Sequence, residues 1–269
     1  MTSGKKARQE RQAVKRPPVR STGGGRQASP KVLAIVTVAI AVAAIAAVVV
    51  FVVAGRGSGS SGSSNLVTTN GATTLPDAGA VTKMFNGIPQ HGNVVGKPGA
   101  PVTMVQYIDL QCPVCRAFET EVMPTIVARY VRNGTVKVVT RPIAFIGADS
   151  ETGRRAAMAA GLQNRLSQFT QLMYFNQGPE NSGWLTNNLI GAAYASIPGL
   201  RSQQALDSKN SSAVLSQLHT FDQQANTDQV HGTPTVFIGK TGGKLTDIAP
   251  GGVPDASTVE AAIKRAQGQ

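Results

Sequence analysis

A run of 23 residues without a charged side chain, Val32–Ala54, divides this chain of 269 residues. As a helix rising about 1.5 Å per residue, the run would span about 34 Å, which is enough to cross a bilayer. A buried helix of a soluble domain normally has a polar face, whereas only Thr37 interrupts this one. The run therefore predicts a single transmembrane helix over residues 32–54, and any globular domain must be built from the residues that follow it.

Basic residues are concentrated in front of the apolar run. Residues 1–31 contain nine Lys or Arg and one acid, and they supply most of the net charge of +12. By the positive-inside rule we expect residues 1–31 to form a disordered cytoplasmic segment, with the remainder outside the cell membrane. Because that remainder is nearly neutral, a nucleic-acid-binding surface is not predicted. The alternative is a signal peptide cleaved after Ala54, but the run exceeds the roughly 7–15 apolar residues usual in such peptides.

A folded domain is expected to follow a flexible linker. Residues 55–78 begin as GRGSGSSGSS and stay rich in small polar residues, which is typical of a linker. In residues 79–269 apolar periodicity predicts strands and helices in the order strand, helix, strand, helices, strand, strand, helix. This order predicts an α/β fold with a helical insertion at about residues 149–228. The predicted elements are strands at 101–109, 135–141, 235–239 and 244–248, a helix at 111–133, a long helical stretch through Ala159, Leu162, Leu166, Phe169 and Met173, later helices with Leu185, Leu189, Ala193, Leu215 and Leu218, and a last helix opened by a Ser257-x-x-Glu260 capping box.

The motif Cys112-Pro113-Val114-Cys115 stands where the first predicted strand gives way to a helix. A thiol in the first turn of a helix faces unpaired N–H groups and the positive end of the helix dipole, and both favour the thiolate. A thiolate attacks a disulfide to give a mixed disulfide, which a second thiol resolves. We therefore predict that Cys112 is the nucleophile and Cys115 the resolving thiol. Pro113 suits the first turn, where its missing N–H is harmless.

Three other interpretations of the cysteine pair remain open. A structural disulfide across so short a loop would remove little entropy from the unfolded chain. Half of a zinc site would need two further ligands, for which His91, His219 and His231 are the candidates. The pair could also be two unreactive buried thiols. The sequence contains no phosphate-binding or metalloprotease motif, so we predict neither a cofactor nor a metal site.

Two stretches resemble a known family. Residues 96–119, GKPGAPVTMVQYIDLQCPVCRAFE, and residues 230–240, VHGTPTVFIGK, are similar to the two signatures of the DsbA-like thiol-disulfide oxidoreductases of bacteria, in the thioredoxin superfamily. The resemblance covers about residues 88–268. It implies a thioredoxin fold with an inserted helical subdomain, an enzyme that exchanges disulfides with protein substrates, and a membrane redox partner that recycles it.

The resemblance also implies a second part of the site. The Thr233–Pro234 peptide bond should be cis and lie beside the cysteines. The backbone before this proline should bind an extended substrate as an added strand, and the Thr233 side chain should affect redox properties. His231, three residues before Pro234, is a candidate to lie near the thiols, but the default interpretation of a lone histidine is a surface or structural residue.

Two positions depart from the family pattern. Many relatives have a buried acid six residues before the first cysteine, and this chain has Gln106, which cannot take a proton. Asp109 is then a candidate for handling the proton of the resolving thiol, or else a solvated residue at the strand end. Between the cysteines, Pro113 and Val114 are the expected redox-tuning residues. Because Val114 stands where the best-known oxidases have histidine, we expect a less oxidising pair.

The sequence leaves the direction of the chemistry open. An oxidase, a reductase and an isomerase of this fold would share the same motif, and the direction depends on the redox potential and the recycling partner. A binding or chaperone module that keeps the fold with an idle CxxC is the alternative from another class of protein.

Overall fold

The computed structural model describes residues 67–69 and 72–268. The chain divides into two units, Met1–Ser61 and Gly62–Gln269, and the described residues belong to the second. The predicted membrane span at 32–54 lies outside the described residues. Within residues 67–69 and 72–268, no helix combines the length and apolarity needed to cross a membrane.

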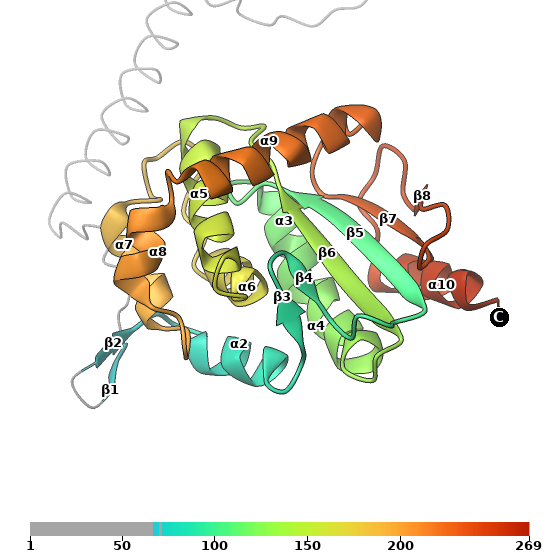
Figure 1. Ribbon diagram of the computed structural model, residues 1–269, viewed down its shortest axis with the longest axis horizontal. Helices are drawn as coiled ribbons and strands as arrows, with labels where there is room; N and C mark the ends of the chain where they lie inside the picture. The colour runs from blue at the N-terminus through green and yellow to red at the C-terminus, as the bar shows by residue number, and fades with distance from the viewer. Residues whose placement is uncertain (1–66, 70–71, 269) are drawn as a thin grey trace, which may run out of the picture. The chain divides into compact units, whose positions relative to one another are not determined.

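A mixed sheet of six strands forms the centre of the described unit (Figure 1). The strand order is β3-β4-β6-β5-β7-β8, in which β5 and β6 are parallel and the other pairs are antiparallel. Strand β5 is buried along nearly its whole length, as its almost continuous apolar sequence requires of a strand covered on both faces. The strands are β3 (Gln90–His91), β4 (Val94–Val95), β5 (Val102–Ile108), β6 (Val136–Pro142), β7 (Thr235–Lys240) and β8 (Thr246–Asp247).

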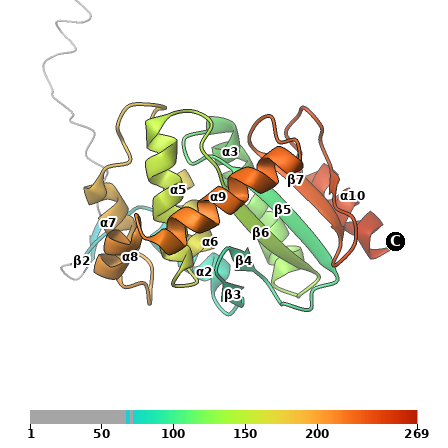
Figure 2. The same cartoon turned by 45° about the horizontal axis from the view of Figure 1, so that its top comes forward.

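Helices cover both faces of this sheet. A segmented helix after β5 lies on one face together with α10 (Ala256–Gln267), while α9 (Ser212–Thr227) crosses the other face (Figures 1 and 2). The segmented helix contains two wider π turns, and Pro124, which lacks the N–H of a regular helix, is the second residue after the first of them. Its segments are α3 (Pro113–Ala117), η1 (Phe118–Val122), α4 (Met123–Ile126) and η2 (Val127–Val131).

The predicted helical insertion lies between β6 and β7, so the unit is a thioredoxin-like α/β fold with an inserted helical subdomain. One continuous helix through Leu162 and Leu166 is wrong, because the chain turns between them and Asn164 takes the left-handed conformation at φ 59°. The turn leaves Leu162 48% exposed rather than buried. The inserted helices are α5 (Ala148–Gly161), α6 (Leu166–Phe175), α7 (Asn187–Ala195), α8 (Ser202–Ser208) and α9.

The structure differs from the sequence-based predictions at three further places. Part of the predicted linker 55–78 is structured, because residues 67–69 and 72–74 form an antiparallel strand pair and Leu75 is buried. The last helix is capped by Asp255, whose side chain accepts from the Thr258 N–H, and not by Ser257. Leu215 points outward and is 39% exposed. The strands of this pair are β1 (Val67–Thr69) and β2 (Ala72–Thr74), followed by helix α2 (Ala78–Phe85).

Candidate active site

The beginning of the segmented helix holds both cysteines. Strand β5 ends at Ile108, and Cys112 is the N-cap residue of α3, so the predicted helix start at Gln111 is slightly early. The Cys112 Sγ accepts a hydrogen bond from the Cys115 backbone N–H at 3.3 Å. A side chain in this position satisfies one of the free donors of a helix N-terminus. Pro113 occupies the first turn, as expected.

These contacts make Cys112 acidic. Its pKa falls from 9.0 to about 6, mainly through the hydrogen bond from the Cys115 thiol, and burial opposes this shift. The backbone N–H groups of Cys115 and Val114 and the side chain of Thr233 lower the pKa further. When protonated, the Cys112 thiol donates to the Thr233 carbonyl at 3.3 Å. Near neutral pH the thiolate is therefore the main form.

Cys115 has the opposite properties. Burial raises the pKa of its thiol well above the usual value, and the neighbouring Cys112 raises it further. The two cysteines are free thiols in this structure. Cys112 is 6% exposed and Cys115 is 0% exposed. Only Cys112 therefore presents any surface to a partner, and it is also the sulfur that ionises.

The loop before β7 lies beside Cys112. The Thr233–Pro234 peptide bond is cis, and the Thr233 carbonyl is the group that the Cys112 thiol contacts. Thr233, Pro234 and Val114 line a surface cavity of about 460 Å³, and His231 is also part of its wall. Val114 is 43% exposed and gives this cavity an apolar edge next to the nucleophile. The structure thus brings together the two segments that the sequence places about 120 residues apart.

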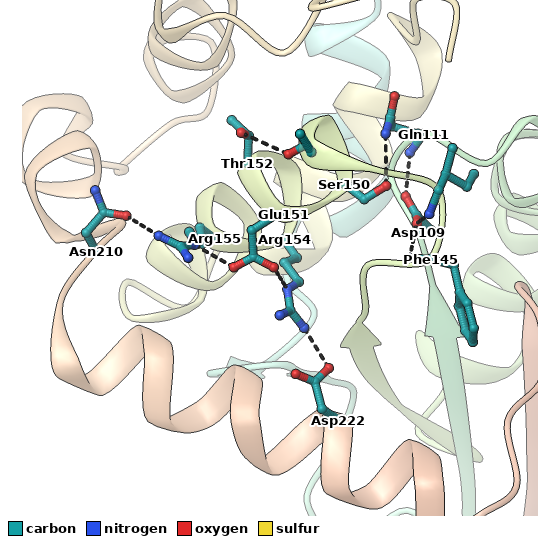
Figure 3. A network of polar contacts seen from close by, with 12 residues as sticks. Asp109, Gln111, Phe145, Ser150, Glu151, Thr152, Arg154, Arg155, Asn210 and Asp222 are labelled. Carbon is teal, nitrogen blue, oxygen red and sulfur yellow. Dashed lines mark hydrogen bonds and ion pairs between the residues drawn. The ribbon is translucent and has the colours of Figure 1, made fainter. Parts of the chain in front are cut away.

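Asp109 is buried, so the expectation of a solvated strand-end residue is wrong. Its Oδ1 accepts from the Gln111 N–H at 2.9 Å, and its Oδ2 accepts from the Phe145 and Ile146 N–H groups at 2.8 and 3.1 Å (Figure 3). Both carboxylate oxygens are thereby engaged by backbone donors. The carboxylate ties the loop before the cysteines to the loop between β6 and α5.

Two side chains of the inserted subdomain also hold this loop. The Tyr174 hydroxyl donates to the Asp109 carbonyl at 2.9 Å. The Gln177 amide donates to the carbonyls of Leu110 and Cys112 at 2.8 and 3.1 Å. These contacts fix the backbone from which Cys112 projects, so the insertion helps to position the nucleophile.

Glu119 is a buried acid that our sequence analysis missed. Its Oε1 accepts from the Gln106 Nε2 at 2.7 Å, and Gln106 also donates to the Thr140 hydroxyl at 3.0 Å. Burial raises the pKa of Glu119 from 4.5 to about 8, and the Gln106 hydrogen bond opposes this shift. The carboxyl group is therefore largely protonated at neutral pH.

The sequence did contain a signal for Glu119. It follows Cys115 by four residues, a spacing that places two side chains on the same face of a helix. Its neighbour Gln106 occupies the strand position at which the family resemblance led us to expect an acid. In this chain the buried carboxyl group thus belongs to the helix, and the strand supplies the amide that binds it.

The fold and the paired thiols define a member of the thioredoxin superfamily, and comparison with known proteins gives the same class. The thioredoxin family model matches residues 90–247. The chain is 28% identical over 147 residues to the probable disulfide bond formation protein D of Bacillus cereus, covering 54% of this chain and 68% of that protein. It is 24% identical over 147 residues to disulfide bond formation protein D of Bacillus subtilis, covering 54% of this chain and 66% of that protein.

Solved structures share the fold. Oxidised BdbD from Bacillus subtilis superposes with a TM-score of 0.58 at 20% identity, covering 68% of this chain and 98% of that chain. DsbA from Chlamydia trachomatis superposes with a TM-score of 0.56 at 18% identity, covering 67% and 93%. The chain belongs to the thioredoxin family. Within it, the chain is a DsbA-like thiol-disulfide oxidoreductase.

Proposed function

We propose that this protein exchanges disulfides with other proteins outside the cytoplasm, using Cys112 and Cys115 as its redox pair. The observation that carries the proposal is the difference between the two thiols. Cys112 has a pKa of about 6 and contacts the residues that line the surface cavity, while Cys115 is fully buried with a raised pKa. A pair of this kind provides one sulfur that meets the partner and one that resolves the mixed disulfide. The Bacillus relatives are named for disulfide bond formation, which supports the same chemistry.

In the oxidising direction the reaction has two exchange steps. A substrate thiolate attacks the Cys112 Sγ of the Cys112–Cys115 disulfide, and the bond to Cys115 breaks with its electron pair left on the Cys115 sulfur, which takes up a proton. A second substrate thiolate then attacks the substrate sulfur of the mixed disulfide and releases Cys112 as a thiolate. The substrate loses two electrons and two protons, and the cysteine pair gains the two electrons. One proton stays on Cys115 and the other passes to solvent.

The low pKa of Cys112 favours this direction. A stabilised thiolate is a better leaving group, and stabilising the reduced form makes the pair more oxidising. Val114, directly before Cys115, limits how oxidising the pair can be. Its side chain offers neither charge nor hydrogen bond to the thiolate. We therefore propose an oxidant weaker than a comparable pair with histidine at this position, with reductase or isomerase action as the alternative.

Glu119 is the group that we propose handles the proton of Cys115. It lies one helical turn beyond Cys115 on the buried side of the helix, and its pKa of about 8 keeps a proton available at neutral pH. It can give this proton to the Cys115 thiolate when the disulfide opens and accept one when it closes. Asp109 was the sequence-based candidate for this role, but its carboxylate oxygens are already engaged by three backbone N–H groups.

The remaining parts of the proposal concern partners and location. The cavity beside Thr233 and Pro234 supports docking of an extended segment of a protein substrate. The apolar run at 32–54, with basic residues before it, supports a single-pass anchor with the cytoplasmic N-terminus at 1–31. A redox protein of the same membrane would then return the cysteine pair to its starting state.

The redox equilibrium of the full-length protein with glutathione tests this function. We expect the cysteine pair to cycle reversibly between dithiol and disulfide. We also expect Val114→His to shift its equilibrium constant at least about tenfold toward the reduced form, which is about 30 mV for a two-electron couple. The imidazolium would stabilise the adjacent thiolate. Failure of the pair to form a disulfide at any glutathione ratio would contradict the proposed activity, and an unchanged constant in V114H would contradict the role given to Val114.

A further inference from the structure

A second cavity lies away from the cysteines, among the inserted helices. It measures about 330 Å³ and sits between the middle of α5, the start of α7 and the turn joining α8 to α9. All the described residues that line it are polar: Glu151, Thr152, Arg155, Asn187, Lys209 and Asn210.

The acceptor groups of this cavity are already used. The Oε1 of Glu151 accepts from Arg155 at 2.6 Å, and its Oε2 accepts from Arg154, which also binds Asp222 (Figure 3). Asn210 Oδ1 accepts from Arg155 at 2.9 Å, and Asn187 Oδ1 accepts from Lys209 at 2.5 Å. The side-chain oxygens of the glutamate and both asparagines therefore face cations of the protein itself.

The cavity contains more N–H donors than acceptors to receive them. Lys209 is half-buried and its hydrogen bond goes to a neutral amide, while the described residues offer it no carboxylate within ion-pair distance. Burial lowers its pKa, which is the cost of a partly desolvated ammonium without an opposite charge. The side-chain NH₂ groups of Asn187 and Asn210 have both of their N–H donors left over once their oxygens are bound. A ligand that fits this cavity must therefore bring several acceptors and negative charge.

We propose that this cavity binds a phosphate-type anion, held by Lys209 and Arg155 together with the amide groups of Asn187 and Asn210. A tetrahedral oxyanion offers acceptors in several directions at once, and its hydrogen bonds to ammonium and guanidinium groups are charge-assisted. The start of α7 adds a favourable field, since Asn187 is the first residue of this nine-residue helix. The anion would give the Lys209 ammonium the oppositely charged partner that the described residues do not provide.

Two sources share this chemistry, free inorganic phosphate and a phosphodiester such as a lipid or polymer head group. Titration of the full-length protein with inorganic phosphate and, separately, with glycerophosphoglycerol distinguishes them. Chloride keeps the ionic strength constant, and the ³¹P signal reports binding. We expect one saturable site for at least one of the two ligands, and the tighter of them identifies the source.

Variants at Lys209 make the test specific. We expect Lys209→Gln to weaken binding about tenfold or more and Lys209→Arg to retain most of it, because arginine keeps the charge and the donors. Lys244→Gln removes the same charge from an exposed lysine between β7 and β8 and should leave binding unchanged. The thermal unfolding of each variant checks that it is folded. Absence of saturable binding for both ligands, or equal weakening by K209Q and K244Q, would overturn the proposal.

Discussion

Cys112→Ser is expected to abolish disulfide exchange while leaving the fold intact. A serine hydroxyl is not ionised near neutral pH and cannot form a mixed disulfide, so the rate should fall by about three orders of magnitude or more, the scale seen when a catalytic nucleophile is removed. Serine is also a favourable N-cap residue and can accept the Cys115 N–H in place of the sulfur. The rate of oxidative refolding of a reduced protein substrate measures the loss.

Cys115→Ala provides the matched control, because it removes the other sulfur and keeps the nucleophile. Without a resolving thiol, Cys112 should accumulate as a mixed disulfide with its substrates, which non-reducing electrophoresis and mass spectrometry can identify. Refolding activity that persists in C112S, or mixed disulfides through Cys115 in that variant, would contradict the assignment of Cys112. A molecule with an idle CxxC would give equal activity in both variants.

The largest expected effect on stability concerns Glu119. Its pKa is about 8 in the folded protein and near 4.5 when unfolded, so the unfolded state loses the proton first as the pH rises. Stability supplied by the protonated group is complete below pH 4.5 and is lost as the pH rises to about 8. At about 1.4 kcal/mol per pKa unit, the loss is on the order of 5 kcal/mol. Glu119→Gln, which stays neutral and keeps an acceptor for Gln106, should escape this loss.

Urea unfolding under reducing conditions, from pH 4 to pH 9, measures the effect as the difference between E119Q and the wild type. This difference removes the contribution of Cys112, which titrates in both proteins. Glu121→Gln on the exposed side of the same helix is the matched control and should follow the wild type at every pH. A constant difference between E119Q and wild type across this range would show that the Glu119 carboxyl group ionises normally.

Local patterns predicted the parts of the site that depend on neighbouring residues. Strand β5, the helix after it and the CPVC motif between them follow from hydrophobic periodicity and from the chemistry of a helix N-terminus. The segment Gly232–Thr235 before β7 was found through its resemblance to a family. These features can be predicted without knowing which distant segments of the chain are in contact.

Long-range contacts explain what the sequence did not reveal. The environment of Glu119 depends on Gln106 from the strand, thirteen residues earlier, and on the covering helix α6. Asp109 can be buried because the backbone N–H groups of Phe145 and Ile146 bind its carboxylate. The pattern of side chains in the sequence does not predict these backbone contacts. The break between α5 and α6 depends on a left-handed residue, Asn164, inside an apparently continuous apolar period. In each case the deciding partner is a backbone group or a residue of another element.

The acidity of the Cys112 thiol is the central claim, and the pH dependence of its alkylation tests it most directly. Iodoacetamide reacts with the thiolate, and mass spectrometry of the reduced full-length protein assigns the product to Cys112 rather than to buried Cys115. We predict that the rate at Cys112 rises with a midpoint near pH 6 and levels off by pH 8. A midpoint near pH 9, or a rate no faster than that of an ordinary thiol at neutral pH, would contradict the account.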